Sequence, residues 1–196
     1  MVQPLVIGIA GPSGAGKTTL AKHLVEKYSD SVTHLRLDAF FKNVREFPMH
    51  ERWINREVPE NLYWDEFFAA LQKLRAGEVI EIPQYDRASG APIGVERIEP
   101  RPIIVVEGYL LYFDARVRDA IHVRVYVNTS VDEQYKRKKS RWPDMDDEYF
   151  FQVVVPMFEK FGSQGAAHAH AVLCGDQNEN ALLEEFFASP HIKKYF

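Results

Sequence analysis

Residues 11–18 combine three glycines with a lysine and a threonine at a spacing that could do chemistry. They read Gly-Pro-Ser-Gly-Ala-Gly-Lys-Thr, which matches the pattern G-x-x-x-x-G-K-[S/T]. Glycines let consecutive backbone N–H groups curve around phosphate oxygens, and a helix N-terminus behind them adds unpaired donors. Lys17 would then reach the β- and γ-phosphates, and the Thr18 hydroxyl would hold Mg²⁺. We predict a triphosphate site built from Gly11, Ser13, Gly14, Ala15, Gly16, Lys17, Thr18 and Thr19.

Two acidic residues follow apolar segments that have the character of buried parallel strands. Asp38 comes after residues 32–37, and Glu107 comes after residues 103–106. Because ligands bind outside the carboxyl ends of such strands, we expect both carboxylates beside the glycine-rich loop. Asp38 is a candidate base or metal-shell group, and Glu107 matches the second metal-shell position. The alternatives are that Asp38 only caps a short helix and that Glu107 is an exposed strand end.

Five of the six residues 136–141 are lysine or arginine, although the whole chain has a formal charge of −4. A basic run is usually a solvated helix face. Bound triphosphate needs counter-charges, however, and arginines placed over it stabilise the transferring phosphoryl group. We therefore predict a lid at about residues 135–145, with Arg137 and Arg141 as catalytic residues alongside Lys17 and Asp38.

The elements that would position these groups alternate between apolar strands and amphipathic helices. Strands are expected at 5–9, 32–37, 103–106, 122–127 and 168–173, and helices at 17–26, 63–75, 146–161 and 179–187. Residues 79–83 and 95–99 alternate apolar and polar side chains around a turn-rich stretch, which predicts a hairpin standing off the main sheet. The polar loop 42–61 contains aromatic and charged residues, so we interpret it as a substrate loop.

The length, net charge and cysteine count of the chain limit the class of protein. A chain of 196 residues predicts one domain, 1–196, with an acceptor-binding region at about 42–100. The negative net charge argues against nucleic acid as a partner, and no apolar run approaches the roughly 20 residues of a membrane span. The single cysteine, Cys174, cannot form an internal disulfide, and we expect a cytoplasmic location. The sequence leaves open whether the chain forms a homo-oligomer.

With these pieces placed, the chain resembles the uridine kinase and nicotinamide riboside kinase group of small P-loop kinases, which is related to phosphoribulokinase. The resemblance covers nearly the whole length. The stretches that carry it are residues 11–18, 37–42 (Leu-Asp-Ala-Phe-Phe-Lys), 55–61, 82–86, 105–111 (Val-Val-Glu-Gly-Tyr-Leu-Leu), the basic lid and 155–161. The glycine-rich motif alone is common to many enzymes, whereas the ordered set is much more specific.

The resemblance implies an α/β P-loop fold with a five-stranded parallel sheet, ATP as donor and a ribonucleoside-like acceptor that is phosphorylated on its 5′-hydroxyl. By position, Asp38 matches the family's catalytic acid/base, and Thr18 and Glu107 match its magnesium-shell residues. Glu57 stands where the family places an acid that holds the ribose hydroxyls. Trp142 lies near an aromatic residue that stacks on the base in the riboside kinases.

The chain departs from the family pattern mainly in the acceptor region. Arg87 stands where uridine kinases usually carry Phe, and Arg56 replaces an aromatic residue expected beside the diol-binding acid. The pyrimidine-reading His and the Arg-Gly-Arg pattern of the lid have no counterpart. The predicted acceptor residues are Arg56, Glu57, Tyr85, Asp86, Arg87 and Trp142. The two arginines permit an anionic acceptor instead of a nucleoside.

Two alternatives to a nucleoside kinase remain at this point. One is a kinase for another small metabolite, such as a sugar, a pantothenate-like acid or a sugar phosphate. The other is a nucleotide-binding regulatory protein without transfer activity, although retention of Lys17, Thr18, Asp38 and Glu107 together argues against it. A switch GTPase is disfavoured because no Asn-Lys-x-Asp motif occurs in the chain.

Overall fold

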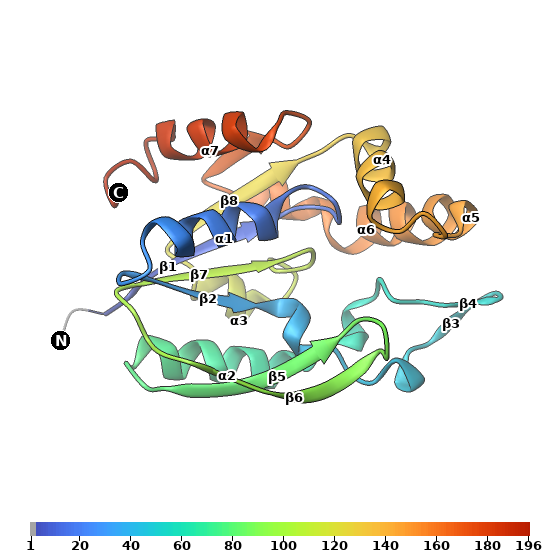
Figure 1. The fold of residues 1–196 in the computed structure, drawn as a ribbon, viewed down its shortest axis with the longest axis horizontal. Helices are drawn as coiled ribbons and strands as arrows, with labels where there is room; N and C mark the ends of the chain where they lie inside the picture. Colours follow the sequence, from blue (N-terminus) through green and yellow to red (C-terminus); the bar gives the residue numbers. More distant parts are fainter. Residues whose placement is uncertain (1–2) are drawn as a thin grey trace.

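The computed structural model describes residues 3–196 and has a five-stranded parallel sheet at its centre (Figure 1). The strands are β1 (Leu5–Ala10), β2 (Val32–Arg36), β7 (Ile103–Gly108), β8 (Val123–Asn128) and β9 (Ala171–Cys174), in the order β2-β7-β1-β8-β9. Each neighbouring pair runs parallel, with Ile7 of β1 opposite Val105 of β7 and Val123 of β8. β1 is therefore the central strand, and the loop that follows it has β7 and β8 on its two sides.

Apolar side chains on both faces of the central strands build two cores, as expected for a sheet covered on both sides. Ile7 and Ile9 point into one core with helices α1 (Lys17–Lys27) and α7 (Glu179–Ala188). Val6 and Ala10 point into the other core, which contains α2 (Trp64–Arg75) and Val117 of α3 (Ala115–Asp119). The expected five-stranded parallel sheet flanked by helices is confirmed.

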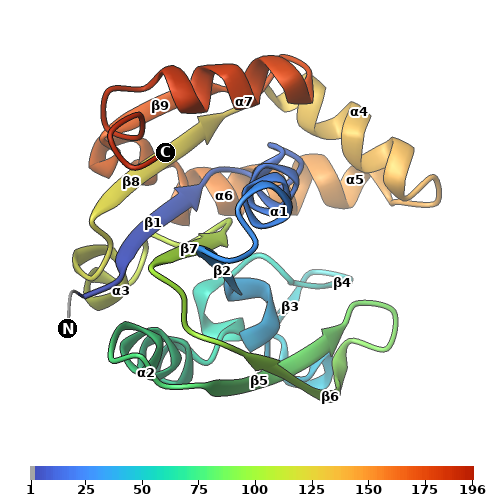
Figure 2. The same cartoon turned by 60° about the vertical axis from the view of Figure 1, so that its left-hand side comes forward.

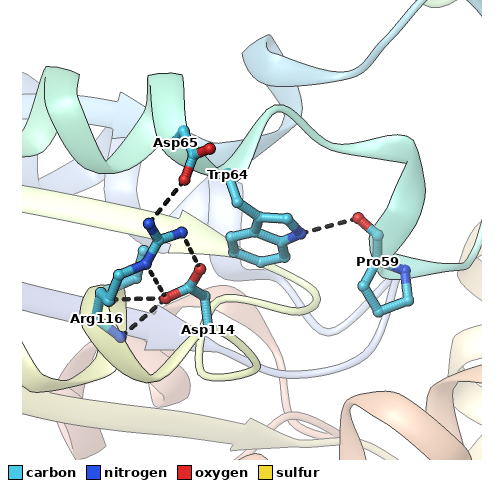
Figure 3. Close-up of polar contacts among 6 residues, drawn as sticks. Pro59, Trp64, Asp65, Asp114 and Arg116 are labelled. Carbon is cyan, nitrogen blue, oxygen red and sulfur yellow. Dashed lines mark hydrogen bonds and ion pairs between the residues drawn. The ribbon is translucent and has the colours of Figure 1, made fainter.

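Two helices on one face are joined by polar contacts at their N-termini (Figure 3). Asp114 caps α3, and its carboxylate also pairs with Arg116 at 2.7 Å. Arg116 reaches across to Asp65 of α2, again at 2.7 Å, while the Trp64 indole donates to the Pro59 carbonyl at 2.8 Å. These bonds fix the end of the segment 42–61 against the helical layer.

The hairpin is a separate two-stranded sheet, β5 (Ile80–Asp86) and β6 (Ala91–Ile98), which lies beside α2 and away from β8 and β9 (Figure 2). Its arms are longer than the predicted 79–83 and 95–99 because the turn is tight. The Asp86 carboxylate accepts the N–H groups of Ala88 at 3.3 Å and Ser89 at 2.7 Å, which closes the turn.

The loop 42–61 is more regular than its composition predicts. It contains short 3₁₀ turns at Val44–Glu46 and Pro59–Asn61 and a small ribbon of β3 (Met49–His50) and β4 (Trp53–Ile54). The 3₁₀ turn Leu37–Phe40 ends β2 one residue earlier than expected. These short elements satisfy backbone groups that a structureless loop would leave to water.

The basic segment forms α4 (Val131–Arg141), and the predicted helix 146–161 is one helical stretch with an irregular centre. It consists of α5 (Asp147–Tyr149), a π-helical turn at Phe150–Val154 and α6 (Val155–Phe161). Pro156 has no N–H to donate to the preceding turn, which favours a wider turn before it. The last strand begins at Ala171 rather than at 168 because Ser163–His168 forms a 3₁₀ turn.

None of the helices in residues 3–196 combines the length and apolar character that a membrane crossing would need.

Candidate active site

The glycine-rich loop curves between the end of β1 and the start of α1. Gly11 has φ +145°, and a Cβ there would lie 2.3 Å from the Val127 carbonyl oxygen, so only glycine fits. Gly16 precedes α1 with φ +93°, and no side chain caps the helix. The first N–H groups of α1 therefore remain available to an anion. This is the local geometry that a phosphate cradle requires.

Lys17 is buried at the foot of the loop. Its ammonium group donates to the Pro12 carbonyl at 2.8 Å. Burial lowers the pKa of Lys17, while the nearby carboxylates of Glu107 and Asp38 act in the opposite direction. A cation so placed has lost most of its water and gains the most from a phosphate group that it can contact.

Glu107, at the end of β7, lies against the first turn of α1. The Thr18 hydroxyl donates to its carboxylate at 3.1 Å, and the His34 Nε2 atom of β2 lies 3.6 Å from the same oxygen. Burial alone would raise the pKa of Glu107, but His34, Lys17 and the Thr18 hydrogen bond hold it below its usual range. The side chain is thus an ionised, buried acceptor of hydrogen bonds.

The oxygens of Thr18 and Glu107 fit Mg²⁺ chemically. Hydroxyl and carboxylate oxygens are hard ligands, and Mg²⁺ is usually held by one or two protein groups together with substrate phosphates. Within residues 3–196 there is no group of three or more His, Cys, Asp or Glu side chains that could hold a metal ion.

Asp38 lies in the 3₁₀ turn that follows β2, and its carboxylate pairs with Arg87. The Asp38 charge is the main reason that the pKa of Arg87 is raised. Arg87 comes from the turn of the β5–β6 hairpin, which is tied to the 3₁₀ turn of residues 44–46 by a bond from Val44 N–H to the Gly90 carbonyl at 2.8 Å. The predicted base and an acceptor-region arginine therefore meet directly.

Helix α4, which carries the basic run of the predicted lid, contacts the glycine-rich loop through Arg137. Its guanidinium donates to the Gly14 carbonyl at 3.1 Å, to the Gln177 carbonyl at 3.0 Å and to Glu133 at 2.8 Å. These bonds occupy most of its donors, so Arg137 fastens the lid to the loop in this structure. Arg141 lies further along the helix, 5.4 Å from the centre of the Trp142 ring.

Lys138 is the lid cation that the sequence analysis did not single out. It is only 8% exposed, and its stem lies 3.7 Å from the position of a Cβ on Gly14. Burial lowers the pKa of Lys138, against the opposing charges of Glu57 and Asp38. Among residues 3–196 its ammonium group has no hydrogen bond or ion pair, but it lies 5.8 Å from the centre of the Phe150 ring, and the residue lines the cavity beside the phosphate loop. The run of five cations in residues 136–141 predicted positive charge near the loop, but it could not show that Lys138 is the buried one.

Glu57 and Arg56 lie on the loop that faces the lid. The Tyr149 hydroxyl lies 3.5 Å from the Glu57 carboxylate and accepts the Arg56 N–H at 3.1 Å. The Tyr109 hydroxyl contacts the Arg56 carbonyl at 3.4 Å. Nearby, the Trp53 indole donates to Asp146 at 2.8 Å. The acceptor loop is thus anchored to the helix after the lid.

These groups line one cavity of about 990 Å³, a volume at the upper end of the range usual for ligand pockets. The predicted residues that line it are Ser13, Gly14, Gly16, Lys17, Thr18, Thr19, Asp38, Arg56, Glu57, Tyr85, Arg87, Glu107, Arg137, Arg141 and Trp142. Lys138, Tyr109 and Tyr149 also line it, as does Phe41. Tyr109 lies within the resemblance stretch 105–111, but that stretch did not mark it as a site residue, and Tyr149 lies in a helix whose aromatic residues resemble core positions.

Three predicted site residues lie outside the lining of this cavity. Gly11 and Ala15 are buried in the loop, where they shape the backbone. Asp86 is different, because its carboxylate is used by the hairpin turn and does not reach the cavity. In this structure the Asp86 carboxylate holds the turn from which Arg87 projects, and its contact with the acceptor stays a prediction.

Comparison with known proteins supports the family resemblance that the sequence motifs indicated. The family model described as "Phosphoribulokinase / Uridine kinase family" matches residues 6–147, which include the loop, both carboxylates and the lid. The chain belongs to this family. It is therefore an ATP-dependent small-molecule kinase of the P-loop type.

The similar proteins span nearly the whole of this kinase. A uridine kinase from Chloroflexus aggregans is 31% identical over 182 residues, covering 88% of this chain and 87% of that protein. A uridine kinase from Leuconostoc citreum is 32% identical over 186 residues, covering 88% of each. The solved phosphoribulokinase from Rhodobacter spheroides superposes with a TM-score of 0.64 at 10% identity, over 87% of this chain and 71% of that one. That likeness shows a common fold.

Proposed function

We propose that this kinase transfers the γ-phosphoryl group of ATP to the 5′-hydroxyl of a ribonucleoside-like acceptor. The observation that carries the proposal is the placement of Glu57 and Asp38 along one cavity with Lys17. Glu57 can accept hydrogen bonds from a vicinal diol, while Asp38 can accept the proton of a primary alcohol. The uridine kinases that resemble this chain supply the expectation that the acceptor is a nucleoside.

In this mechanism the acceptor oxygen forms a bond to the γ-phosphorus as the bond from that phosphorus to the β–γ bridging oxygen breaks. The hydroxyl proton passes to Asp38, whose second carboxylate oxygen is free of the hydrogen bond to Arg87. Lys17 and Lys138 stabilise negative charge on the phosphoryl oxygens, and ADP leaves with the bridging oxygen. Mg²⁺, when held by Thr18 and Glu107, would neutralise charge on the phosphates.

The structural frame of this proposal is a single kinase domain over residues 1–196. Its acceptor-binding region is about 42–100, and its lid is about 135–145. A cytoplasmic location is part of the same proposal, because a lone cysteine suits a reducing compartment. The partners are then ATP and a small acceptor, without nucleic acid or membrane.

A second candidate acceptor class is a small anionic alcohol, and one observation favours it. Arg56 and Arg87 both line the cavity, and Arg56 has no ion pair among residues 3–196 that would balance its charge. A non-catalytic nucleotide-binding protein is less well supported, because such a protein has no need for the carboxylate of Asp38 and the second lysine, Lys138, on the wall of the same cavity as Lys17.

The test is acceptor-dependent ADP release from MgATP, measured against a panel of nucleosides, sugars and small hydroxy acids. We expect a ribonucleoside to stimulate ADP release by at least about 100-fold over the rate without acceptor, since positioned acid–base groups contribute roughly 10²–10⁴-fold. Lys17→Ala should abolish this stimulation. Nucleotide binding without stimulation by any compound would favour the non-catalytic alternative.

A further inference from the structure

His34 places a polar ring on a face of the sheet that is otherwise apolar. It stands in β2 opposite Val105 of β7, and its neighbours on that face, Val32 and Val105, are buried in the core that α1 covers. Strand positions of this kind favour β-branched side chains such as valine and isoleucine. An aliphatic residue would suit this position at least as well, so packing alone does not account for the imidazole.

The Nε2 atom of His34 is buried, and among residues 3–196 it has no hydrogen-bond partner. Buried polar atoms are nearly always hydrogen-bonded, because an unpaired one loses its water without a replacement. The Glu107 carboxylate oxygen Oε1 lies 3.6 Å away. This is longer than an N–H···O hydrogen bond of about 2.7–3.2 Å, and a small rotation of either side chain closes the difference. Glu107 is therefore the acceptor within reach.

The register of the sheet explains why these two side chains meet. Glu107 lies two residues beyond Val105 in β7, so both side chains are on the face that carries His34. Arg36 is the residue of β2 directly opposite Glu107, but its guanidinium pairs with Glu96 of the hairpin. His34, rather than Arg36, is the β2 side chain that approaches Glu107.

A single hydrogen bond does not fix the plane of the Glu107 carboxylate. The Thr18 hydroxyl donates to Oε1 at 3.1 Å from the first turn of α1. The last torsion of a glutamate side chain is broad, so the carboxylate can rotate about that one contact. His34 approaches the same oxygen from a different element, and a second donor restricts the rotation. Both contacts fall on Oε1, and they leave Oε2 open.

We infer that His34 is a positioning residue for Glu107. Its Nε2–H donates to Oε1 and holds the carboxylate in the orientation in which Glu107 takes part in Mg²⁺ binding. The inference deepens the proposed function, because it rests on the assignment of Thr18 and Glu107 to Mg²⁺. Groups that orient metal-binding side chains in this way typically contribute roughly 10- to 100-fold to metal affinity.

The test is Mg²⁺-dependent binding of a non-hydrolysable ATP analogue to the full chain, followed by calorimetry with no acceptor present. His34→Gln and His34→Met introduce side chains of similar length, but only the amide of glutamine can donate to Glu107. His34→Met should raise the Mg²⁺ concentration for half-maximal binding about tenfold or more, while the affinity in EDTA changes less than about twofold. His34→Gln should restore most of the Mg²⁺ dependence.

Thr33→Val is the matched control, because Thr33 is the buried neighbour of His34 in β2 and its side chain lies on the opposite face of the sheet. It should leave the Mg²⁺ dependence unchanged. Native Mg²⁺ dependence in His34→Met would overturn the inference. So would an equal loss of binding with and without Mg²⁺, which indicates a packing role, or a His34→Gln variant no better than His34→Met. If His34→Met does not fold, His34→Leu makes the same comparison with a different shape.

A double-mutant cycle shows whether His34 acts through Glu107. In the Glu107→Gln background, His34→Met should change the Mg²⁺ dependence less than about twofold, because the carboxylate that His34 positions is gone. A full additional loss in the double variant would mean that His34 acts elsewhere, and it would overturn the inference.

These binding measurements contain no acceptor, so they do not depend on nucleoside transfer. Transfer to a riboside together with unchanged Mg²⁺ dependence in His34→Met overturns the positioning role and leaves the proposed function standing. A weakened Mg²⁺ dependence in His34→Met that His34→Gln restores, without transfer to any riboside in the ADP-release assay, supports the positioning role and overturns the nucleoside acceptor.

Discussion

At the scale of single residues, the site depends on a few buried charges that face one another or a ligand. Lys17 and Glu107 belong to one such group, and Lys138 is the member without an ion pair among residues 3–196. The Lys138 side chain is mostly buried, and its ammonium group contacts the Phe150 ring. Its placement beside Gly14 makes sense if phosphate oxygens complete its environment.

Lys138→Met should lower the turnover number by about 10²-fold, because the side chain keeps its length but loses the charge that stabilises the phosphoryl oxygens. The melting temperature should change little, since the variant loses a cation–π contact with Phe150 but no longer has to keep a charge in a mostly buried position. Steady-state kinetics and thermal unfolding check both parts. Lys136→Met is the control, as Lys136 lies on the same helix with a side chain that is 78% exposed, and it should leave turnover unchanged.

Glu107→Gln should weaken Mg²⁺-dependent nucleotide binding by roughly 10- to 100-fold, because the amide keeps the shape of the side chain but not its charge. The measurement is a Mg²⁺ titration of ATP-analogue binding, which does not depend on turnover. Glu26→Gln, on the exposed side of α1, provides the comparison. Equal Mg²⁺ dependence in all three proteins would remove Glu107 from the metal site.

The separate roles of Arg137 and Lys138 could not be predicted from the sequence. The composition of residues 136–141 predicts a basic lid, but every cation in the run is chemically suitable. Which one reaches the loop backbone and which one stays free depends on the rotation of α4 about its axis. That rotation is set by the packing of α4 against Gly14 and against Phe150, 5.8 Å from the Lys138 ammonium group, both distant in sequence.

At the scale of elements, the phosphate loop works because β1, β8 and α1 leave room only for a backbone. Gly11 illustrates this, since a side chain there would meet the backbone of Val127 in β8. Gly77, after α2, also has a positive φ of +82°, but nothing lies within 4 Å of its missing Cβ. A side chain at Gly77 would cause backbone strain alone, whereas a side chain at Gly11 would cause both strain and a steric clash.

Gly11→Ala should therefore destabilise the protein much more than Gly77→Ala. For Gly77→Ala we expect a loss of about 1–2 kcal/mol from backbone strain alone. For Gly11→Ala the loss should exceed roughly 3 kcal/mol, or the chain should fail to fold, because backbone atoms must also move. Urea unfolding followed by far-UV circular dichroism compares the two. Similar losses would mean that the approach of β8 to the loop is not tight.

Sequence periodicity predicts the strands and most helices because each has one clear apolar pattern. It fails where partners distant in the chain decide the structure. The loop 42–61 has no repeating pattern, yet Asp146 and Tyr149 hold it in place. The π-helical turn at Phe150–Val154 is likewise invisible to a pattern with a period of 3.6 residues.

At the scale of the whole molecule, the parallel sheet brings three chain segments to one edge. The order β2-β7-β1 places the ends of three neighbouring strands together, so Asp38, Glu107 and the glycine-rich loop open onto one cavity. This convergence was predictable from the sequence, because it follows from the general geometry of open α/β sheets. The acceptor side was less predictable, since Arg87 reaches Asp38 from a hairpin that is not part of that sheet.

The central claim is that Asp38 receives the acceptor proton in a site that binds ATP without its help. The most direct test is ³¹P NMR of the reaction with the best acceptor of the panel, together with calorimetric ATP binding, for the native protein, Asp38→Asn and the exposed control Asp30→Asn. The account predicts a phosphate monoester of the acceptor in the native and Asp30→Asn reactions. Asp38→Asn should form it roughly 10²–10⁴-fold more slowly with ATP affinity within about threefold of native. Unchanged turnover in Asp38→Asn would contradict the account.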